Sequence, residues 1–443
     1  MADPTLVGEL HGRVAEALSS WREREEAGDR PPTRDDQRRY ASALIAEELD
    51  RHARAQIDQG VDPMDATEEE EVARTLHAML FELGSLEPLL ADPDIESIDY
   101  NGCDVGFLQY ADGNIKPAPP IAASDDKFVV MIQMLGARVG HVPRRFDRGQ
   151  PRLNLRLPDG SRLFALMDVS HRPVLSIRRH RLVRVFLRNL VELGAIDAGL
   201  EAFLAALVRA RKNLIIAGGT GAGKTTMLRA LLNEVPPEER LVTIENAFEL
   251  GLHEPGLADL HPNVAALEAR EANVEGEGEI TMAELVRAGL RMNPSRVIVG
   301  EVLGDEIVSM LEAMSQGNDG SMGTIHATSS AYVWRRMAMY AAKSAMRLPA
   351  EVTYQMIDGA IDFVVFIAQH DERAIGGPLR RFVSSVREVT GAEGQQVITN
   401  EVYRPGPDGR TVPNPGVLRR RQDLELAGFD LNWLENREGW WER

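Results

Sequence analysis

Cysteine and long apolar runs are nearly absent from this sequence. Cys103 is the single cysteine in 443 residues, which excludes an internal disulfide and a zinc cage of several thiolates and fits a reducing compartment. Apolar stretches such as IDFVVFIA have the length of a strand, whereas a membrane-spanning helix needs about 20 apolar residues. The N-terminus lacks the basic start and apolar segment of a secretory signal. We therefore expect a cytoplasmic protein without a membrane span.

Lysine is scarce, and negative charge outweighs positive charge. Five of the 50 basic residues are lysines, at positions 116, 127, 212, 224 and 343, so arginine is the ordinary cation of this chain and its abundance indicates no site. The formal net charge is −18, which opposes broad binding to the phosphates of nucleic acid. A nucleic-acid partner is therefore not the expected one, and a local basic patch is the alternative that stays open.

Length and composition indicate a globular protein with more than one core. Apolar residues make up 44% of the chain and charged residues 27%, and 443 residues exceed the size of one usual domain. From about residue 95 to 180, short β-like segments with PDG and ADGN turns surround one helix-like stretch. Beyond about residue 187, helices alternate with short apolar strands, which predicts a largely parallel sheet covered by helices, with ligands at the carboxyl ends of the strands.

These changes of pattern predict an α/β protein of five segments. We expect a charged helical extension over residues 1–66, a mixed α/β domain over 67–180, a linker over 181–195, a domain with the parallel sheet over 196–370 and a C-terminal appendage over 371–443.

The turn in KNLIIAGGTGAGKTTMLRAL carries the strongest functional signal. It matches the pattern G-x-x-x-x-G-K-S/T between a strand and a helix, which is the context that this phosphate-binding motif requires. Glycines let backbone N–H groups converge on phosphate oxygens, and the following helix adds its positive end. We expect Lys224 to reach the β and γ phosphates of ATP and the Thr225 hydroxyl to bind magnesium. The expected nucleotide-binding residues are Gly218, Gly219, Thr220, Gly221, Ala222, Gly223, Lys224, Thr225 and Thr226.

Acidic residues and one histidine follow other predicted strands. Glu301 follows the apolar run of NPSRVIVGEV, where a carboxylate can polarise the attacking water or hold a magnesium-bound water. Glu245 ends the strand in LVTIENAFEL, and Glu249 lies one helical turn later. His326 follows the strand in GSMGTIHATS, where it can sense the γ phosphate. We expect these four side chains and the glycine turn to form one catalytic site.

The order and spacing of several motifs are more specific than the glycine turn alone. Between about residues 75 and 400 the chain contains LGSLEPLLADPDIESIDYNG, LPDGSR, LSIRRHR, AGGTGAGKTTML, TIENAFEL, NVEGEGEITMAELVRAGLRMNPSRVIVGEV and GSMGTIHATS. Together they resemble the type II/IV secretion ATPase superfamily, and most closely the CpaF-like ATPases of Flp/Tad pilus assembly. The resemblance implies a RecA-like P-loop NTPase core, preceded by a smaller mixed α/β N-terminal domain and peripheral helices, with ATP and magnesium as ligands.

The resemblance also implies an assembly and a set of roles. It implies a homo-hexameric ring that docks on an inner-membrane platform protein at the cytoplasmic face and powers pilus assembly or protein secretion. Residues 218–226 correspond to the Walker A motif, and the N-terminal domain is implied to supply arginines that neutralise charge on the nucleotide. The implied catalytic residues are the Walker B glutamate Glu301, the acidic-box residues Glu245 and Glu249, the His-box residue His326, and the arginines Arg162, Arg178 and Arg179.

The chain departs from the family pattern at three single positions and in RMNPSR, where R-M-R-P-D-R is common. Asn246 replaces an aspartate of the acidic box, Leu303 replaces an arginine after Gly-Glu-Val, and Asn318 replaces a histidine of the His box. These departures keep a second hypothesis open, a nucleotide-binding switch or scaffold with little turnover. A third hypothesis is a DNA-handling motor, since RecA-like cores also drive helicases and conjugation. The acidic balance and the lack of basic, aromatic platforms for single strands weigh against it.

Overall fold

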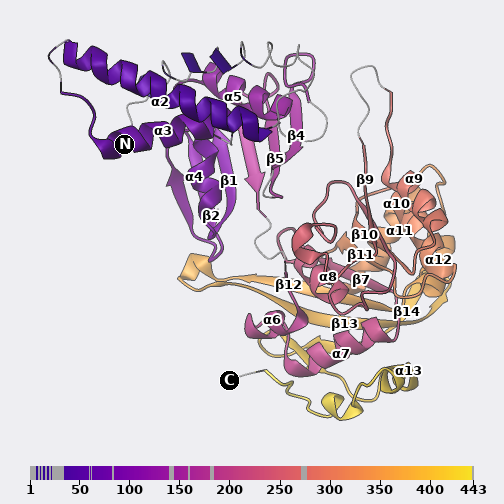
Figure 1. Ribbon diagram of the computed structural model, residues 1–443. Coiled ribbons are helices and arrows are strands. Elements are labelled where there is room, and N and C mark those ends of the chain that lie inside the picture. Colours follow the sequence, from indigo (N-terminus) through magenta and orange to yellow (C-terminus); the bar gives the residue numbers. More distant parts are fainter. Residues whose placement is uncertain are drawn as a thin grey trace. The chain divides into compact units, whose positions relative to one another are not determined.

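The computed structural model describes residues 34–58, 60, 62–81, 84–138, 144–157, 160–179, 184–270 and 277–441, together with a few positions before residue 34. The chain divides into two compact units (Figure 1). The first comprises Met1–Leu155 and Arg162–Arg179, and the second comprises Arg156–Ser161 and His180–Arg443. The finer division into five segments stays a prediction.

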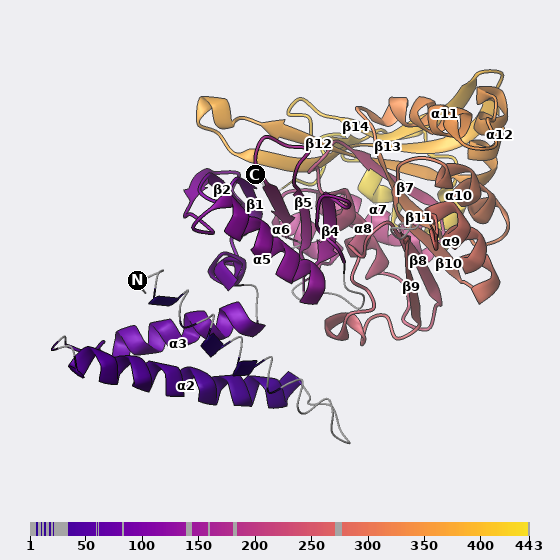
Figure 2. The ribbon, with the colours of Figure 1, turned by 90° about the horizontal axis from the view of Figure 1, so that it is seen from above.

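The first unit begins with two packed helices, α2 (Arg34–Asp58) and α3 (Ala66–Phe81), which lie side by side in Figure 2. Their apolar residues recur at helical spacing and share one buried cluster, in which Ile45 and Leu49 of α2 join Leu76 of α3. Asp65 precedes α3 and accepts hydrogen bonds from the backbone N–H groups of the first turn, which fixes where the helix begins. The short helices η1 (Gly84–Leu86) and α4 (Glu87–Ala91) lead into the sheet.

A six-stranded sheet completes the first unit, in the order β3-β2-β1-β6-β5-β4. Burial alternates along its strands, as in β6, where Leu175 and Ile177 are buried while Ser176 and Arg178 are exposed. On the buried side, the rings of Tyr100 and Phe128 of α5 lie 6.1 Å apart. The elements are β1 (Ile95–Asn101), β2 (Gly106–Tyr110), β3 (Ile115–Ala118), α5 (Asp125–Arg138), β4 (Arg152–Arg156), β5 (Arg162–Leu166) and β6 (Val174–Arg178).

The second unit is built on a nine-stranded sheet in the order β15-β14-β13-β12-β7-β11-β10-β8-β9. The six strands from β12 to β9 run parallel. Strand β13 continues the sheet antiparallel to β12, and β14 and β15 follow, each antiparallel to the strand before it. The strands are β7 (Leu214–Gly218), β8 (Leu241–Glu245), β9 (Val264–Glu268), β10 (Arg296–Val302), β11 (Met322–His326), β12 (Phe363–Asp371), β13 (Leu379–Glu393), β14 (Gln396–Pro405) and β15 (Thr411–Pro413).

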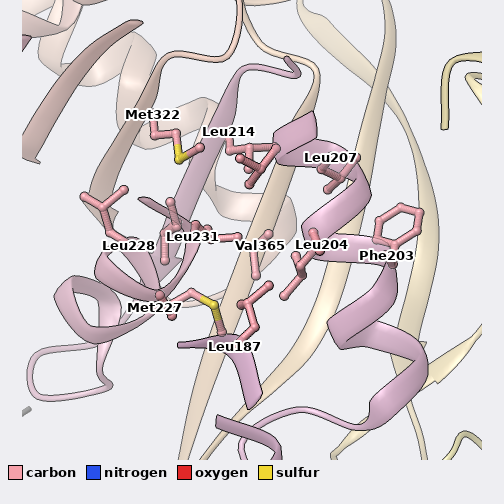
Figure 3. Packing of buried hydrophobic residues seen from close by; sticks show 14 of the residues in the cluster. Leu187, Phe203, Leu204, Leu207, Leu214, Met227, Leu228, Leu231, Met322 and Val365 are labelled. Atoms are coloured by element: carbon pink, nitrogen blue, oxygen red, sulfur yellow. The ribbon is translucent and has the colours of Figure 1, made fainter. Parts of the chain in front are cut away.

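Helices cover both faces of this sheet. One apolar cluster joins α6, α7 and α8 to the sheet (Figure 3), where Leu204 and Leu231 pack near Val365 of β12. The second cluster joins α9 to α12 to the opposite face. The helices are α6 (Leu187–Glu192), α7 (Ala198–Arg209), α8 (Lys224–Leu232), η2 (Pro255–Leu257), α9 (Met282–Gly289), η3 (Leu290–Met292), α10 (Glu306–Ser315), η4 (Ser330–Tyr332), α11 (Val333–Lys343), α12 (Ala350–Ala360), η5 (Arg373–Ile375), α13 (Arg421–Leu426) and η6 (Leu431–Leu434). Across the described ranges, no helix is both long enough and apolar enough to cross a membrane.

The residues expected to form a C-terminal appendage contribute three strands to the same sheet. Their later part is also bound to the body of the second unit. The carboxylate of Glu388, which is 0% exposed, accepts hydrogen bonds from the backbone N–H groups of Arg419 and Arg420. Asp197, at the start of α7, accepts one from the Trp440 backbone. Because these carboxylates are buried, the hydrogen bonds that satisfy them also fix the C-terminal segment.

Candidate active site

The glycine turn lies where β7 ends and α8 begins. All five residues of β7 are buried between β11 and β12. The chain then reverses through Gly221 and Gly223, whose φ angles of 72° and 95° lie in the left-handed region that favours glycine. A Cβ on Gly218 would lie 2.7 Å from the Ile367 carbonyl oxygen, whereas a Cβ on Gly219, Gly221 or Gly223 would meet no atom within 4 Å. The turn is therefore held against the sheet on one side and open on the other, as a phosphate cradle requires.

Lys224, the first residue of α8, points its ammonium group back across this turn. Its side chain is largely buried, with 7% of the residue exposed. Nζ donates a hydrogen bond to the Gly219 carbonyl oxygen at 3.0 Å and lies 3.2 Å from Nδ1 of His326. A buried ammonium is costly unless its donors are satisfied, so these contacts hold a positive charge at the mouth of the turn.

His326 connects Lys224 to Glu301. Its Nε2 lies 2.6 Å from Oε1 of Glu301, because β10 and β11 are parallel neighbours and both side chains stand at their carboxyl ends. Burial, and then the charge of Lys224, lowers the pKa of His326 against the opposing effect of Glu301. A neutral ring with its proton on Nε2 satisfies both neighbours, since Nδ1 accepts from Lys224 and Nε2 donates to Glu301. The structure thus brings these three predicted site residues into one hydrogen-bonded chain.

Glu245 and Glu249 lie on the next part of this edge, in different environments. Glu245 is 2% exposed, and its Oε2 accepts hydrogen bonds from the backbone N–H groups of Glu249 and Leu250 at 2.7 and 2.8 Å. Burial raises the pKa of Glu245 to about 7 against those hydrogen bonds. Glu249 is half-buried and accepts from the Thr225 hydroxyl at 3.4 Å. Glu249 therefore lies beside the turn, whereas Glu245 holds the backbone of the segment that carries it.

Sequence reasoning missed two arginines that contact this region. Arg229 of α8 is buried and donates to the carbonyl oxygens of Glu249 and Leu250. Arg381 of β13 donates from Nε to the Gly221 carbonyl oxygen at 2.7 Å. Neither position carries a motif, and in a chain with few lysines an arginine gives no local signal. Only the pairing of β13 with β12 brings Arg381 to the turn.

The three predicted arginine fingers belong to the first unit. Arg162 and Arg178 are directly opposed in the register of β5 and β6, so they share one face of the six-stranded sheet. Arg179 faces the other way, is half-buried, and donates to the backbone carbonyl oxygens of Asp92 and Ile95. Arg162 and Arg178 therefore lie side by side on one sheet face, whereas the Arg179 guanidinium is engaged within the first unit.

Of the three residues that depart from the family pattern, two lie at the same edge of the sheet as the glycine turn and one lies at the opposite edge. Asn246 follows β8 directly and is exposed, and Leu303 follows β10 and is 50% exposed, so both stand at the carboxyl edge of the sheet. Asn318 precedes β11, and its amide donates to the Ala313 carbonyl oxygen at 3.1 Å. Because the glycine turn lies at the carboxyl edge, Asn318 stands at the opposite edge of the sheet and supports the connection after α10.

The residues at this edge fit a nucleotide with its magnesium. Open amides, a buried lysine and a helix start are the groups that bind phosphates, and a threonine hydroxyl is a suitable oxygen ligand for magnesium. Within the described ranges, no group of three or more His, Cys, Asp or Glu side chains is arranged to hold a metal ion.

Comparisons with known proteins identify a family and several relatives of this chain. The family described as type II/IV secretion system protein matches residues 125–398. A putative conjugal transfer protein of Mycobacterium tuberculosis is 35% identical over 336 residues, which cover 74% of this chain and 90% of that protein. The type IV secretion system protein PtlH of Bordetella pertussis is 30% identical over 333 residues, which cover 68% and 93%. The crystal structure of the VirB11 ATPase from the Brucella suis type IV secretion system is 25% identical, covers 72% of this chain and 96% of that one, and has a TM-score of 0.37.

Proposed function

This chain belongs to the family of type II/IV secretion system proteins, and from this premise we propose that it is an ATP-hydrolysing motor that powers protein secretion or pilus assembly. The observation that carries the proposal is the chain of contacts from Lys224 through His326 to Glu301 beside an open glycine turn. A phosphate-binding turn alone supports binding, and a carboxylate linked to it supports hydrolysis.

Binding is the first role that we assign. The backbone N–H groups of residues 219–223 receive the phosphates, and Lys224 exchanges the Gly219 carbonyl oxygen for oxygens of the β and γ phosphates. Thr225 is the residue that would hold the magnesium ion, whose charge then offsets that of the phosphates. Glu249 accepts a hydrogen bond from the Thr225 hydroxyl, so its carboxylate would stand beside a magnesium ion held there.

Hydrolysis is the second role. Glu301 orients and polarises the attacking water, which contributes about 10² to 10⁴ in rate in acid–base catalysis. The neutral His326 fixes the Glu301 carboxylate through Nε2 and links it to Lys224, so the lysine that contacts the phosphates and the base that acts on water are positioned together. We assign Glu245 a positioning role, because its oxygens are used to hold the backbone of residues 249 and 250.

The finer proposals concern assembly and pathway. The motif order quoted above supports a hexameric ring of the kind that serves Flp/Tad pili, docked at the cytoplasmic face of the inner membrane on a platform protein. Arg162 and Arg178, paired on one sheet face, are the arginines that we expect to neutralise phosphate charge in such a ring. Arg179 is expected to support the loop before β1 instead.

A nucleotide switch with little turnover is the alternative that a specific observation favours. Asn246 stands exposed at the end of β8, where the family pattern has a carboxylate. An amide cannot accept a proton at neutral pH, so a step that needed that second carboxylate would be slow. ATP that binds tightly but is not turned over, with magnesium and anionic membranes present, would favour the switch over the motor.

The test of the proposal compares two lysines. In Lys224→Ala, binding of Mg-ATP and steady-state phosphate release are both expected to disappear, because the buried charge at the turn is lost. The matched control is Lys343→Ala, which removes an exposed lysine at the end of α11 and should leave both measurements within about twofold, as for most surface substitutions. Phosphate release that persists in Lys224→Ala would refute the assignment.

A further inference from the structure

Strand β13 contributes a contact to the phosphate loop that the proposed function does not include. Beyond the point where Ile367 of β12 is paired with Gly218, the strands β12 and β13 continue past the end of β7 as a two-stranded ribbon. Arg381 lies opposite Gln369 on this ribbon. From there its side chain reaches the loop, and Nε donates to the Gly221 carbonyl oxygen at 2.7 Å.

This hydrogen bond fixes the peptide between Gly221 and Ala222. In a trans peptide the C=O and N–H groups point in opposite directions, so an arginine that holds the oxygen from outside turns the Ala222 N–H inward. Inside the loop that N–H donates to the Gly219 carbonyl oxygen at 3.3 Å, the same oxygen that Lys224 contacts. On the Gly221 side, φ is 72° and a Cβ would meet no atom within 4 Å, so the hydrogen bonds with Arg381 and Gly219 orient this peptide.

The same strand also holds the segment after His326. The hydroxyl groups of Ser385 and Ser330 lie 2.8 Å apart, and Arg387 donates to the Ser330 hydroxyl at 2.8 Å. Both serines are buried. Strand β13 therefore contacts both segments that carry the candidate site, the phosphate loop and the residues that follow β11.

We propose that Arg381 is a positioning residue for nucleotide binding: it holds the Gly221–Ala222 peptide with its N–H facing the phosphates and brings a positive charge behind the loop. The inference rests on the proposed function, since it assigns the loop a nucleotide. Because the loop amides contact the α and β phosphates, Arg381 should strengthen the binding of ADP and ATP alike. An arginine that contacted the γ phosphate would strengthen only the binding of ATP.

The experiment uses the full chain and measures dissociation constants for Mg-ADP and for a magnesium complex of a non-hydrolysable ATP analogue. In Arg381→Gln both constants are expected to rise about tenfold, as for loss of a charge-assisted hydrogen bond, while kcat at saturating ATP stays within about threefold. Arg381→Lys keeps the charge but replaces the planar guanidinium by an ammonium group, so its affinities should be intermediate for both ligands. The control is Arg380→Gln, the exposed neighbour on the opposite face of the strand, which should bind as the wild type does.

Wild-type affinity in Arg381→Gln, a loss confined to the ATP analogue, or a fall in kcat with unchanged affinity would each overturn the proposal. If Arg381→Gln does not fold, Arg381→Lys provides the test. Wild-type affinity for both ligands in that variant would overturn the proposal, and an intermediate loss of affinity for both would support it. If the wild-type protein binds neither ligand, the proposed function fails first. That outcome is distinct, because it does not depend on Arg381.

Discussion

The two sheets of this protein place functional groups in opposite ways. In the six-stranded sheet of the first unit, burial alternates along the strands, so a whole face carries exposed side chains such as Arg178. In the nine-stranded sheet of the second unit, every residue of β7 and β8 is buried, because helices cover both faces. Chemistry in the second unit is therefore confined to strand ends. Gly218, Glu245 and His326 are the last residues of β7, β8 and β11.

This difference explains why the local sequence indicates the roles of the strand-end residues in the second unit but not those of the exposed arginines in the first. A residue at the carboxyl end of a parallel strand meets its counterparts wherever the strands are neighbours. A residue on an open sheet face acquires a partner only when another surface covers that face. Substitutions on the open face, at a buried strand end and at the opposite sheet edge should therefore have different effects.

The largest effect is expected from the exposed face of the first unit. Replacing Arg162 and Arg178 together by glutamine should lower kcat by about 10³ while Mg-ADP affinity stays unchanged, because arginine fingers act on charge that develops during phosphoryl transfer. Steady-state phosphate release and equilibrium binding are the measurements. The control is Arg74→Gln, which replaces an exposed arginine of α3 in the same unit. Turnover within about threefold of wild type in the double variant would show that this face takes no part in hydrolysis.

The buried carboxyl group of Glu245, at the end of β8, should make the stability of the protein depend on pH. Its pKa is raised from 4.5 to about 7 by burial, so between these values the folded state keeps a proton that the unfolded state has lost. Its contribution to stability is therefore complete below pH 4.5 and is lost as the pH rises through 7. Over this interval the free energy of unfolding should fall by about 3 kcal/mol on account of this residue.

Urea unfolding between pH 5 and 7.5 tests this prediction. Glu245→Gln should flatten the decline, since an amide does not titrate. Glu279→Gln, at an exposed glutamate of the same unit, should leave the decline as it is in the wild type. An unchanged slope in Glu245→Gln would mean that Glu245 is ionised throughout this range.

The smallest effect is expected at the opposite edge of the second sheet. Asn318→His restores the residue of the family pattern, yet Asn318 precedes β11 and bonds to Ala313. Turnover should therefore stay within about twofold of wild type, as for a change outside the site. A tenfold rise in phosphate release would place this position in the catalytic machinery and weaken the distinction between the two edges.

Much of the fold could be predicted from the sequence. The expected fold class is confirmed: a RecA-like P-loop core with a mainly parallel sheet follows a smaller mixed α/β part and helices. The resemblance to the type II/IV secretion superfamily is confirmed as well. The short apolar runs identified five of the six parallel strands. The exception is β9, which lies at the sheet edge with all five residues half-buried; its sequence, VAALE, is apolar but contains alanine and leucine, which do not distinguish a strand from a helix. The long β13 and β14 belong to the segment expected as a C-terminal appendage, yet β13 pairs with the preceding β12 as a hairpin and β14 pairs with β13.

The same distinction holds for the site. Motifs at the carboxyl ends of predicted parallel strands were enough to expect Lys224, Glu301 and His326 in one site, and their contacts are present. Arg381 could not be found, because 160 residues separate it from Gly221 and nothing local marks it among so many arginines. Asn318 belongs to the His-box motif in sequence, but it precedes β11 and so lies at the amino end of that strand. A motif shows how residues are spaced along the chain and does not show at which edge of the sheet each one lies.

Glu301→Gln separates binding from hydrolysis when Mg-ATP binding and phosphate release are determined on the same preparation. The dissociation constant should stay within about threefold of the wild-type value, because the phosphate loop and Lys224 are intact, and the release rate should fall by about 10² to 10⁴. Phosphate release at the wild-type rate, or loss of nucleotide binding in this variant, would contradict the claim that Glu301 at the end of β10 acts on a nucleotide held at the end of β7.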